Sequence, residues 1–241
     1  AMTRIWPAYL AQSEPPGDGY RYELKVASDA IAAAQARSWL KLHPEGFRVA
    51  FPPRVINNLY FDTIDLQSFN DNLSGVSVRR KLRLRWYDQV GSLTVRDPVL
   101  EIKIKKNMLG SKKQQPLEIA LDLTEPFKEI QKSIYACVNE AWQTQIRPFR
   151  QATLINRYRR EYYVSPDRAI RATLDTALSA YDQRMGTRPN LSRKLPLPAA
   201  VVVEVKAAPE FEKRLQEIMG YFPIARSRSS KYVQGLIGGP F

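Results

Sequence analysis

The chain has 241 residues, 44% of them apolar, and carries 37 Lys and Arg against 24 Asp and Glu, a formal net charge of +13. The apolar fraction is that of a globular protein, and the charge favours polyanionic partners: nucleic acid, polyphosphate, nucleotides or an anionic membrane. The single cysteine, Cys137, excludes an intramolecular disulfide, and the single histidine, His43, excludes a His/Cys zinc cluster and makes Ser-His or Cys-His catalysis improbable. Any metal would therefore be held by carboxylates, which suit a hard ion such as Mg²⁺ or Mn²⁺.

No apolar run approaches the roughly 20 residues that span a bilayer, and the N-terminus lacks the charged and apolar regions of a signal peptide. Together with the single cysteine, these features predict a cytoplasmic protein without a transmembrane segment. The sequence contains no Walker-type glycine loop, RNP motif or helix-turn-helix pattern. It therefore argues against a P-loop nucleotide site and against a specific nucleic-acid partner, whose basic residues should form an outer stripe.

The chain is predicted to begin with an irregular lead-in at residues 1–19, rich in Pro and Gly, followed by a single domain over residues 20–241. Alternating apolar and polar positions predict strands at 20–27, 55–63, 78–87, 99–107, 115–122, 152–165, 167–175 and 199–207. Helical spacing and capping residues predict helices at 29–42, 65–75, 125–142, 210–220 and 227–238. The stretches 107–113 and 176–198 are interpreted as loops, with a short strand as an alternative within the second. Eight mostly sequential strands with helices between them predict an α+β fold built on an eight-stranded antiparallel β-barrel.

Several predicted strands place charged residues on one face and apolar residues on the other. The stretch VRRKLRLRWY (78–87), for example, alternates four basic residues with leucines and a tryptophan. One such strand alone is most simply a solvated sheet face, but a solvent face usually mixes both signs with neutral polar residues, whereas these faces are dominated by cations. The charged faces are Arg21/Glu23/Lys25, Lys81/Arg83/Arg85, Glu101/Lys103/Lys105, Arg157/Arg159/Glu161 and Glu204/Lys206.

If the sheet closes, these charged faces point into one lumen. Such a lumen is repulsive when empty and favourable when a chain of phosphates fills it, because each phosphate accepts charge-assisted hydrogen bonds from several donors. Glu23, Glu101 and Glu204 would then pair with lysines or bind a divalent ion that bridges phosphate oxygens. In VVVEVK (201–206), Glu204 and Lys206 emerge side by side on a stiff strand.

The chain resembles the VTC domain, whose characteristic segments it carries in order: RYELK, NLYFDT, RKLRLRWY, LEIKIK, INRYRREYY, IRATLD, VVVEVK and SSKYVQG, over roughly residues 20–237. The VTC domain is the catalytic module of the vacuolar transporter chaperone polyphosphate polymerase and belongs to the triphosphate tunnel metalloenzymes, the CYTH group. The resemblance implies an eight-stranded antiparallel tunnel with a C-terminal helix at its mouth. It also implies a soluble, stand-alone version without the membrane segments and the SPX domain of the eukaryotic complex.

By resemblance, the tunnel would bind ATP or another triphosphate and polyphosphate, with Mn²⁺ or Mg²⁺ as cofactor. Glu204 would bind the metal, and Glu23 is the second candidate for that role. The residues expected to act in catalysis are Arg83, Arg85, Lys103 and Glu204. The residues expected to bind phosphate are Lys25, Arg83, Arg85, Lys103, Lys112, Lys113, Arg157, Arg171, Lys206 and Lys231.

Some of these basic residues have a plainer alternative. Lys112 and Lys113 lie at the edge of a predicted loop and are equally consistent with solvated surface. Lys231, taken alone, is typical of a surface lysine on the last helix. Arg79 and Lys81 are interpreted as tunnel-mouth or surface charge.

The first strand departs from the wider superfamily, which carries Glu-x-Glu-x-Lys where this chain has RYELK (21–25). Arg21 in place of the first Glu removes one metal-binding carboxylate, which argues against a standard triphosphatase or adenylate cyclase and favours the VTC branch.

The leading hypothesis is transfer of the γ-phosphate of ATP to polyphosphate. The alternatives are metal-dependent hydrolysis of triphosphate or polyphosphate in the same tunnel, and polyphosphate binding without catalysis. The sequence leaves open whether a regulatory or membrane-bound protein partner is needed.

Overall fold

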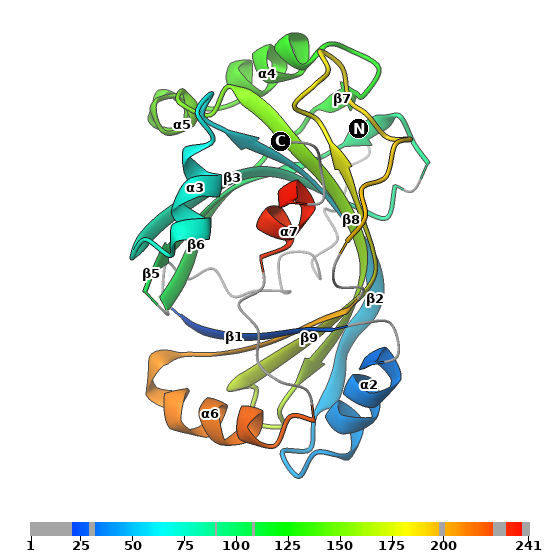
Figure 1. Ribbon diagram of the computed structural model, residues 1–241, viewed down its shortest axis with the longest axis vertical. Coiled ribbons are helices and arrows are strands. Elements are labelled where there is room, and N and C mark those ends of the chain that lie inside the picture. Colours follow the sequence, from blue (N-terminus) through cyan, green and yellow to red (C-terminus); the bar gives the residue numbers. More distant parts are fainter. Residues whose placement is uncertain are drawn as a thin grey trace, which may run out of the picture.

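Eight of the ten strands in the described chain form one closed antiparallel ring (Figure 1). The computed structural model describes residues 21–28, 32–89, 91–107, 109–197, 201–223 and 230–237, so the expected lead-in at 1–19 lies outside the described residues. The strands are β1 (Arg21–Ser28), β2 (Arg48–Asp62), β3 (Val78–Tyr87), β4 (Thr94–Arg96), β5 (Val99–Lys106), β6 (Leu109–Pro116), β7 (Ala120–Asp122), β8 (Gln151–Val164), β9 (Ile170–Asp182) and β10 (Val201–Ala207). The helices are α2 (Ala32–Leu42), α3 (Gln67–Ser74), α4 (Phe127–Ala136), α5 (Glu140–Ile146), α6 (Glu212–Gly220) and α7 (Lys231–Ile237), with a 3-10 turn, η1 (Pro209–Phe211), before α6.

The ring runs in the order β1-β10-β9-β8-β2-β3-β5-β6 and returns to β1, which confirms the predicted α+β fold with an eight-stranded antiparallel barrel. The closing contact is short, since β1 pairs with β6 only through Arg21 opposite Gly110 and Tyr22 opposite Leu109. Strands β4 and β7 form a separate two-stranded sheet.

The strand that completes the ring, β6, differs from the sequence prediction. The predicted loop at 107–113 and the predicted strand at 115–122 are both wrong, because residues 109–116 form β6 and residues 120–122 form β7. Strand β6 is held by eight residue pairs with β5, which place Lys112 opposite Lys103 and Gln114 opposite Glu101. A strand that turns polar side chains toward a polar lumen lacks the apolar alternation by which a half-buried strand is predicted.

Two further boundaries differ from prediction for identifiable reasons. The predicted helix at 125–142 is two helices, because the Asn139 side chain accepts a hydrogen bond from the Trp142 backbone N–H and caps a new helix, α5. Strand β9 continues to Asp182, into the stretch interpreted as a loop at 176–198. The predicted helix at 65–75 is confirmed as α3, which ends at Gly75 with a left-handed φ of 75° that suits glycine.

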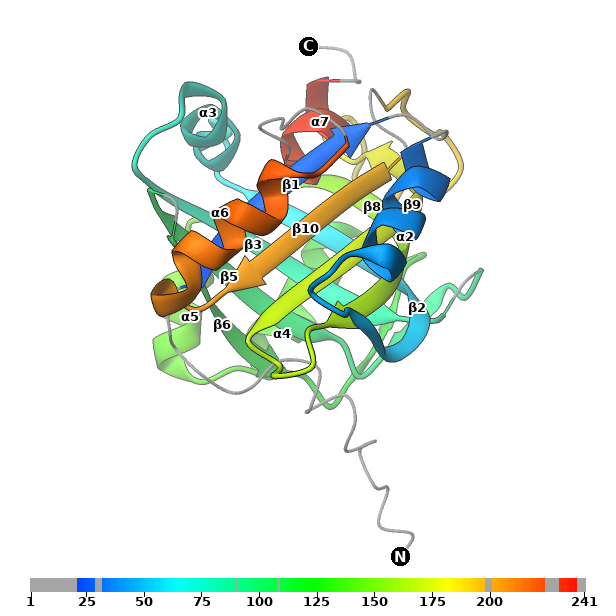
Figure 2. The same ribbon diagram turned by 90° about the horizontal axis from the view of Figure 1, so that it is seen from below.

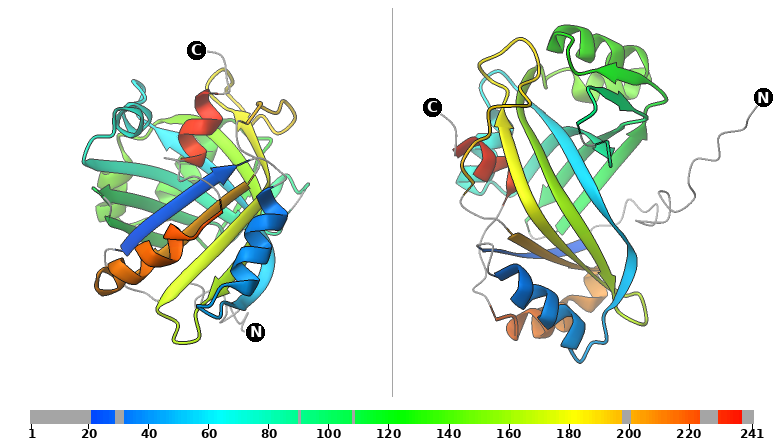
Figure 3. Two further views of the ribbon diagram at one scale, coloured as in Figure 1. Left: turned by 60° about the horizontal axis from the view of Figure 1, so that its bottom comes forward. Right: turned by 90° about the vertical axis from the view of Figure 1, so that its right-hand side faces the viewer.

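The alternation along β3 leaves charge inside the ring and apolar side chains outside it. Its register turns Arg83 and Arg85 toward the lumen, while Leu84 and Trp86 join the core that packs against α4 and α5. A second core lies between α2, α6 and the wall formed by β1, β9 and β10. Figures 2 and 3 show these helices on the outside of the ring. The outer layers therefore supply most of the apolar burial, and the interior is free to be polar.

Helix α7 is the exception, since it lies in the opening of the ring (Figure 1) and packs on β8. Gly235 permits this contact, because a Cβ added there would lie 2.6 Å from the Cδ2 atom of the fully buried Leu154. Across the described ranges, no helix combines the length and the apolar character needed to cross a membrane.

Replacing Gly235 with Ala should lower the free energy of unfolding by about 1–3 kcal/mol, because the added methyl group must displace a packed Leu154. Gly220→Ala at the end of α6 is the matched control, since a Cβ at that position meets nothing within 4 Å. Urea unfolding of both variants measures the difference. Equal stability of the two variants would contradict a tight contact between α7 and β8.

Candidate functional site

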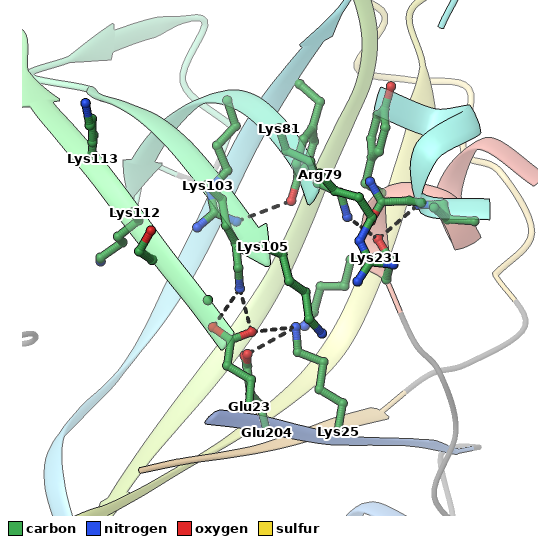
Figure 4. A pocket seen from close by; sticks show the side chains of 18 of the residues that line it. Glu23, Lys25, Arg79, Lys81, Lys103, Lys105, Lys112, Lys113, Glu204 and Lys231 are labelled. Atoms are coloured by element: carbon green, nitrogen blue, oxygen red, sulfur yellow. Dashed lines mark hydrogen bonds and ion pairs between the residues drawn. The ribbon is translucent and has the colours of Figure 1, made fainter. Parts of the chain in front are cut away.

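The ring encloses a cavity of about 1400 Å³, and the described residues that line it include thirteen basic side chains and only two carboxylates, Glu23 and Glu204. The basic residues come from strands β1, β3, β5, β6, β8 and β10 and from helix α7. Figure 4 shows several of them pointing into the same space. They are Arg21, Lys25, Arg79, Lys81, Arg83, Arg85, Lys103, Lys105, Lys112, Lys113, Arg160, Lys206 and Lys231. The cavity thus gathers every predicted site residue except Arg157 and Arg171.

On the wall formed by β1 and β10, Glu23 and Glu204 share Lys25 and Lys206, and Glu23 also pairs with Lys103. Lys103 Nζ lies 2.7 Å from Glu23 Oε2, and Lys25 Nζ lies 3.5 Å from the same oxygen and 3.1 Å from Glu204 Oε1. Lys206 Nζ lies 3.7 Å from Glu204 Oε1. Burial alone would raise the pKa of Glu23, but Lys103, Lys25 and Lys206 outweigh it and lower the pKa to about 2. The pKa of Glu204 is likewise held well below its usual range by Lys206 and Lys25, so both groups are ionised at neutral pH.

Next to the basic row of β3 lies a fully buried carboxylate, Glu101, which is 0% exposed. Arg83 Nη2 lies 2.6 Å from Glu101 Oε2, Arg85 Nη1 lies 3.5 Å from Oε1, and the Gln114 amide donates to Oε1 at 2.6 Å. Burial would raise the pKa of Glu101, but Arg83 and Arg85 outweigh it and lower the pKa to about 2. Glu101 therefore offsets part of the charge of two guanidinium groups and fixes their orientation.

A further buried carboxylate, Asp175 on β9, ties α7 to the wall of the tunnel. Arg160 donates two hydrogen bonds to it, at 2.6 and 2.7 Å, and Lys231 Nζ lies 2.6 Å from its Oδ2 atom. Lys231 thus reaches from the last helix to the lining of the cavity.

The mouth of the tunnel is organised by Asp62 at the end of β2, which is fully buried. Its carboxylate accepts hydrogen bonds from the backbone N–H groups of Ser68 and Phe69 at the start of α3, at 2.9 and 3.0 Å. The Tyr232 hydroxyl of α7 donates to the same carboxylate at 2.5 Å, and the Tyr232 ring stacks on Tyr60 with 5.0 Å between centroids. One carboxylate therefore positions both helices of the mouth.

Several lysines of the lumen have lowered pKa values. Lys81 Nζ donates to Ser230 Oγ at 2.8 Å, and no ion pair among the described residues includes Lys81. Burial, followed by the nearby Lys25 and Lys103, lowers the pKa of Lys81 well below its usual range. Burial also lowers the pKa of Lys103 and of Lys112 to about 7 in each case. An anion in the cavity would favour their charged forms and raise these pKa values again.

The carboxylate oxygens of the cavity suit a hard metal ion only if phosphate oxygens complete the coordination shell of that ion. Glu204 Oε1 is buried and accepts no hydrogen bond, although Lys25 Nζ lies 3.1 Å away. The described ranges hold no group of three or more His, Cys, Asp and Glu side chains that could hold a metal ion. Mg²⁺ commonly takes one or two carboxylates and completes its shell with water and phosphate oxygens. Glu204 and Glu23 therefore fit an ion that enters together with a phosphate substrate.

Two predicted residues do not line the cavity. Arg157 lies on the outer face of β8, where its Nε donates to Asn57 Oδ1 at 2.8 Å, so its expected place in the lumen is corrected. Arg171 sits opposite Lys206 and shares the inward side of β9, but it lies beyond the residues that line the cavity. The pKa of Arg171 is lowered by burial and by Arg21, which itself lines the cavity.

In place of Arg157, strand β8 presents Tyr158 and Arg160 to the lumen. The segment NRYRREYY carries arginines at both odd and even positions, so the strand period of two selects neither set. The register is fixed by β2, where Asn58 pairs with Asn156 and their side chains hydrogen-bond at 2.8 Å. That pairing is a long-range contact and leaves no signal within the segment itself.

A family model described as the VTC domain matches residues 50–237. None of the curated proteins matches the chain.

Among solved structures, a putative adenylyl cyclase from Hippeastrum, described as having a dominant triphosphatase activity, has a TM-score of 0.50 and 15% identity, with 88% of this chain and 90% of that chain covered. A putative adenylate cyclase from Vibrio parahaemolyticus has a TM-score of 0.49 and 11% identity, with coverages of 89% and 96%. A chain of the Schizosaccharomyces pombe Mediator head module has a TM-score of 0.48 and 7% identity, with coverages of 86% and 97%. The Hippeastrum structure shows likeness of fold alone, and the other two are too distant to carry an argument.

Glu101→Gln should lower the free energy of unfolding by about 3–5 kcal/mol, because it leaves the Arg83 and Arg85 guanidiniums without their buried counter-charge. Denaturant unfolding measures this loss, with the exposed Glu118→Gln as the matched control. Added polyphosphate should restore part of the stability of Glu101→Gln, because phosphate oxygens replace the missing carboxylate. A loss no larger than that of the control would contradict the counter-charge role of Glu101.

Proposed function

Because this chain belongs to the VTC domain family, we propose that it transfers the γ-phosphoryl group of ATP to the end of a polyphosphate chain held in the basic cavity. The charge of the cavity carries the proposal. With every basic group protonated, the thirteen lining cations and the four buried carboxylates that pair with them leave an excess of nine positive charges. One ATP triphosphate carries about four negative charges, so a longer chain of phosphates matches this excess better.

The proposed step is an in-line transfer between phosphates. A terminal oxygen of the polyphosphate chain attacks the γ-phosphorus of ATP, the bond from that phosphorus to the β–γ bridging oxygen breaks, and ADP leaves with the electron pair. No covalent intermediate on the protein is needed, because positioning and charge stabilisation supply most of the catalysis in phosphoryl transfer. The chain grows by one phosphate, and the atoms and charges balance without a further reactant.

The basic residues divide into two roles in this step. Arg83 and Arg85, oriented by Glu101, present planar donors suited to bidentate contact with the transferring phosphate. Lys25, Lys103 and Lys231 come from three different elements and offer point charges to oxygens of the neighbouring phosphates. Since these groups are held by buried carboxylates before the substrate arrives, little reorganisation is required during the reaction.

Glu204 and Glu23 are the residues that would hold Mg²⁺ or Mn²⁺ in the proposed enzyme. Such an ion, when bound, neutralises charge on the phosphate oxygens. Glu204 Oε1 accepts no hydrogen bond and is held only by ion pairs with Lys25 and Lys206, which supports this assignment.

Hydrolysis of a triphosphate or of polyphosphate ends is the second candidate, and the activity described for the Hippeastrum structure is the observation that favours it. Hydrolysis requires a group that accepts a proton from the attacking water. The two carboxylates lining the described cavity, Glu23 and Glu204, are ion-paired and have lowered pKa values, so they are weak bases. Lys103 and Lys112, whose pKa values are about 7, are the groups of the described cavity suited to accept this proton. Transfer to a phosphate oxygen that is already ionised needs no such group, which supports transfer between phosphates.

Incubation of the protein with ATP and Mn²⁺ or Mg²⁺ should yield polyphosphate and one ADP per phosphate added, measured by gel electrophoresis and an ADP assay. Glu204→Gln should lower the rate by about a hundredfold or more, because it removes the buried charge assigned to the metal. Glu118→Gln, at an exposed site, is the control and should leave the rate unchanged. Free phosphate without polymer would assign hydrolysis instead, and phosphate binding without turnover under either metal would assign a binding module.

Phosphate binding should take up protons above about pH 7, and affinity should fall as pH rises. In the empty cavity Lys103 and Lys112 have pKa values of about 7, so they are largely neutral at pH 8 and become charged when phosphate raises those values. Calorimetry of tripolyphosphate binding at pH 8 in two buffers with different ionisation enthalpies measures the uptake. Lys103→Arg should keep the affinity and reduce the uptake, whereas the exposed Lys128→Arg should change neither. Proton release on binding would contradict this linkage.

A further inference from the structure

We propose that the nucleoside of ATP binds at the mouth of the tunnel between α3 and α7, an inference that rests on the proposed function. The site is a set of uncharged side chains that line the same cavity as the basic residues. We call it the α3–α7 rim, and it consists of Asn72, Leu73, Val233, Gln234 and Ile237.

The rim has the chemistry of a nucleoside site. Leu73 is 60% exposed and Ile237 is 49% exposed, so both present apolar surface to solvent at the edge of a basic cavity. A nucleobase has two flat apolar faces, and covering one face with aliphatic side chains removes apolar area from water. The Asn72 amide nitrogen donates to the Ser68 carbonyl at 2.7 Å, which leaves its oxygen as an acceptor for a polar edge of the base or sugar.

The chain connectivity of α7 places the rim where the nucleoside has to lie. Lys231 begins the helix and reaches into the lumen, Ser230 just before it holds Lys81, and Val233, Gln234 and Ile237 follow within two turns. A triphosphate held by Lys231 and Lys81 therefore has its attached organic group beside the next residues of the same helix. Figure 1 shows α3 and α7 bordering the opening of the ring.

The opposite end of the ring is a poorer site for a nucleoside. Figure 2 shows α5 at the end of the ring away from α3 and α7, and α5 contributes Asn139, Trp142 and Gln145 to the cavity lining. The Asn139 oxygen accepts from the Trp142 backbone, and the Gln145 amide donates to the Ala141 carbonyl. Trp142 is 9% exposed and belongs to the outer core, so this end differs from the rim in presenting little apolar surface.

Calorimetric titration with ATP and with inorganic tripolyphosphate separates the rim from the phosphate site. The double variant Leu73→Ala/Ile237→Ala should weaken ATP binding about five- to tenfold and leave tripolyphosphate binding unchanged, because only apolar contact with the nucleoside is lost. Gln145→Ala at the opposite end is the matched control and should change neither affinity. Both rim side chains are about half exposed or more, so the double variant should unfold at the temperature of the wild type.

Three results would overturn the proposal: equal weakening of both ligands in the double variant, no weakening of ATP, or selective weakening of ATP by Gln145→Ala. The outcome is separate from turnover. If the double variant weakens ATP binding selectively but the wild-type protein makes no polymer, the nucleoside site is supported and the proposed polymerase activity is contradicted.

Discussion

The constraint on which the rest of this structure depends is the enclosure of like charge within one ring. Thirteen basic side chains face a single cavity, and at the reduced dielectric of a protein interior their mutual repulsion is stronger than in water. Glu23, Glu101, Asp175 and Glu204 each pair with at least one cation from another strand, so every carboxylate also links two parts of the wall. The apolar cores lie outside the ring, where α2, α4, α5 and α6 stabilise a scaffold whose interior opposes folding.

Much of the fold could be predicted because the outward faces follow simple rules. Wherever an apolar face meets an outer helix, as at Leu84 and Trp86 of β3 or Val203 and Val205 of β10, the strand period is plain in the sequence. The prediction fails at β6, whose polar residues are held in the ring by pairing with β5. Strand formation there is decided by a partner, and no local pattern records it.

The same distinction explains which site residues could be predicted. Lys25, Arg83, Lys103 and Glu204 lie on strands with one apolar face, so the direction of their side chains follows from the alternation. Strand β8 carries charged and apolar residues on both faces, which is why Arg157 was expected in the lumen that Arg160 occupies. Asp62 and Asp175 left no signal of their own, because their roles exist only after distant segments meet.

The carboxylate of Asp62 makes the mouth of the tunnel rigid. It binds the first turn of α3 and the Tyr232 hydroxyl of α7 at once, and it is shielded from solvent. A displacement of either helix would strain its own hydrogen bond to Asp62, so this one carboxylate fixes the distance between the two helices. A ligand entering between Leu73 and Ile237 would meet a spacing already fixed, and little conformational entropy would be lost in closing around it.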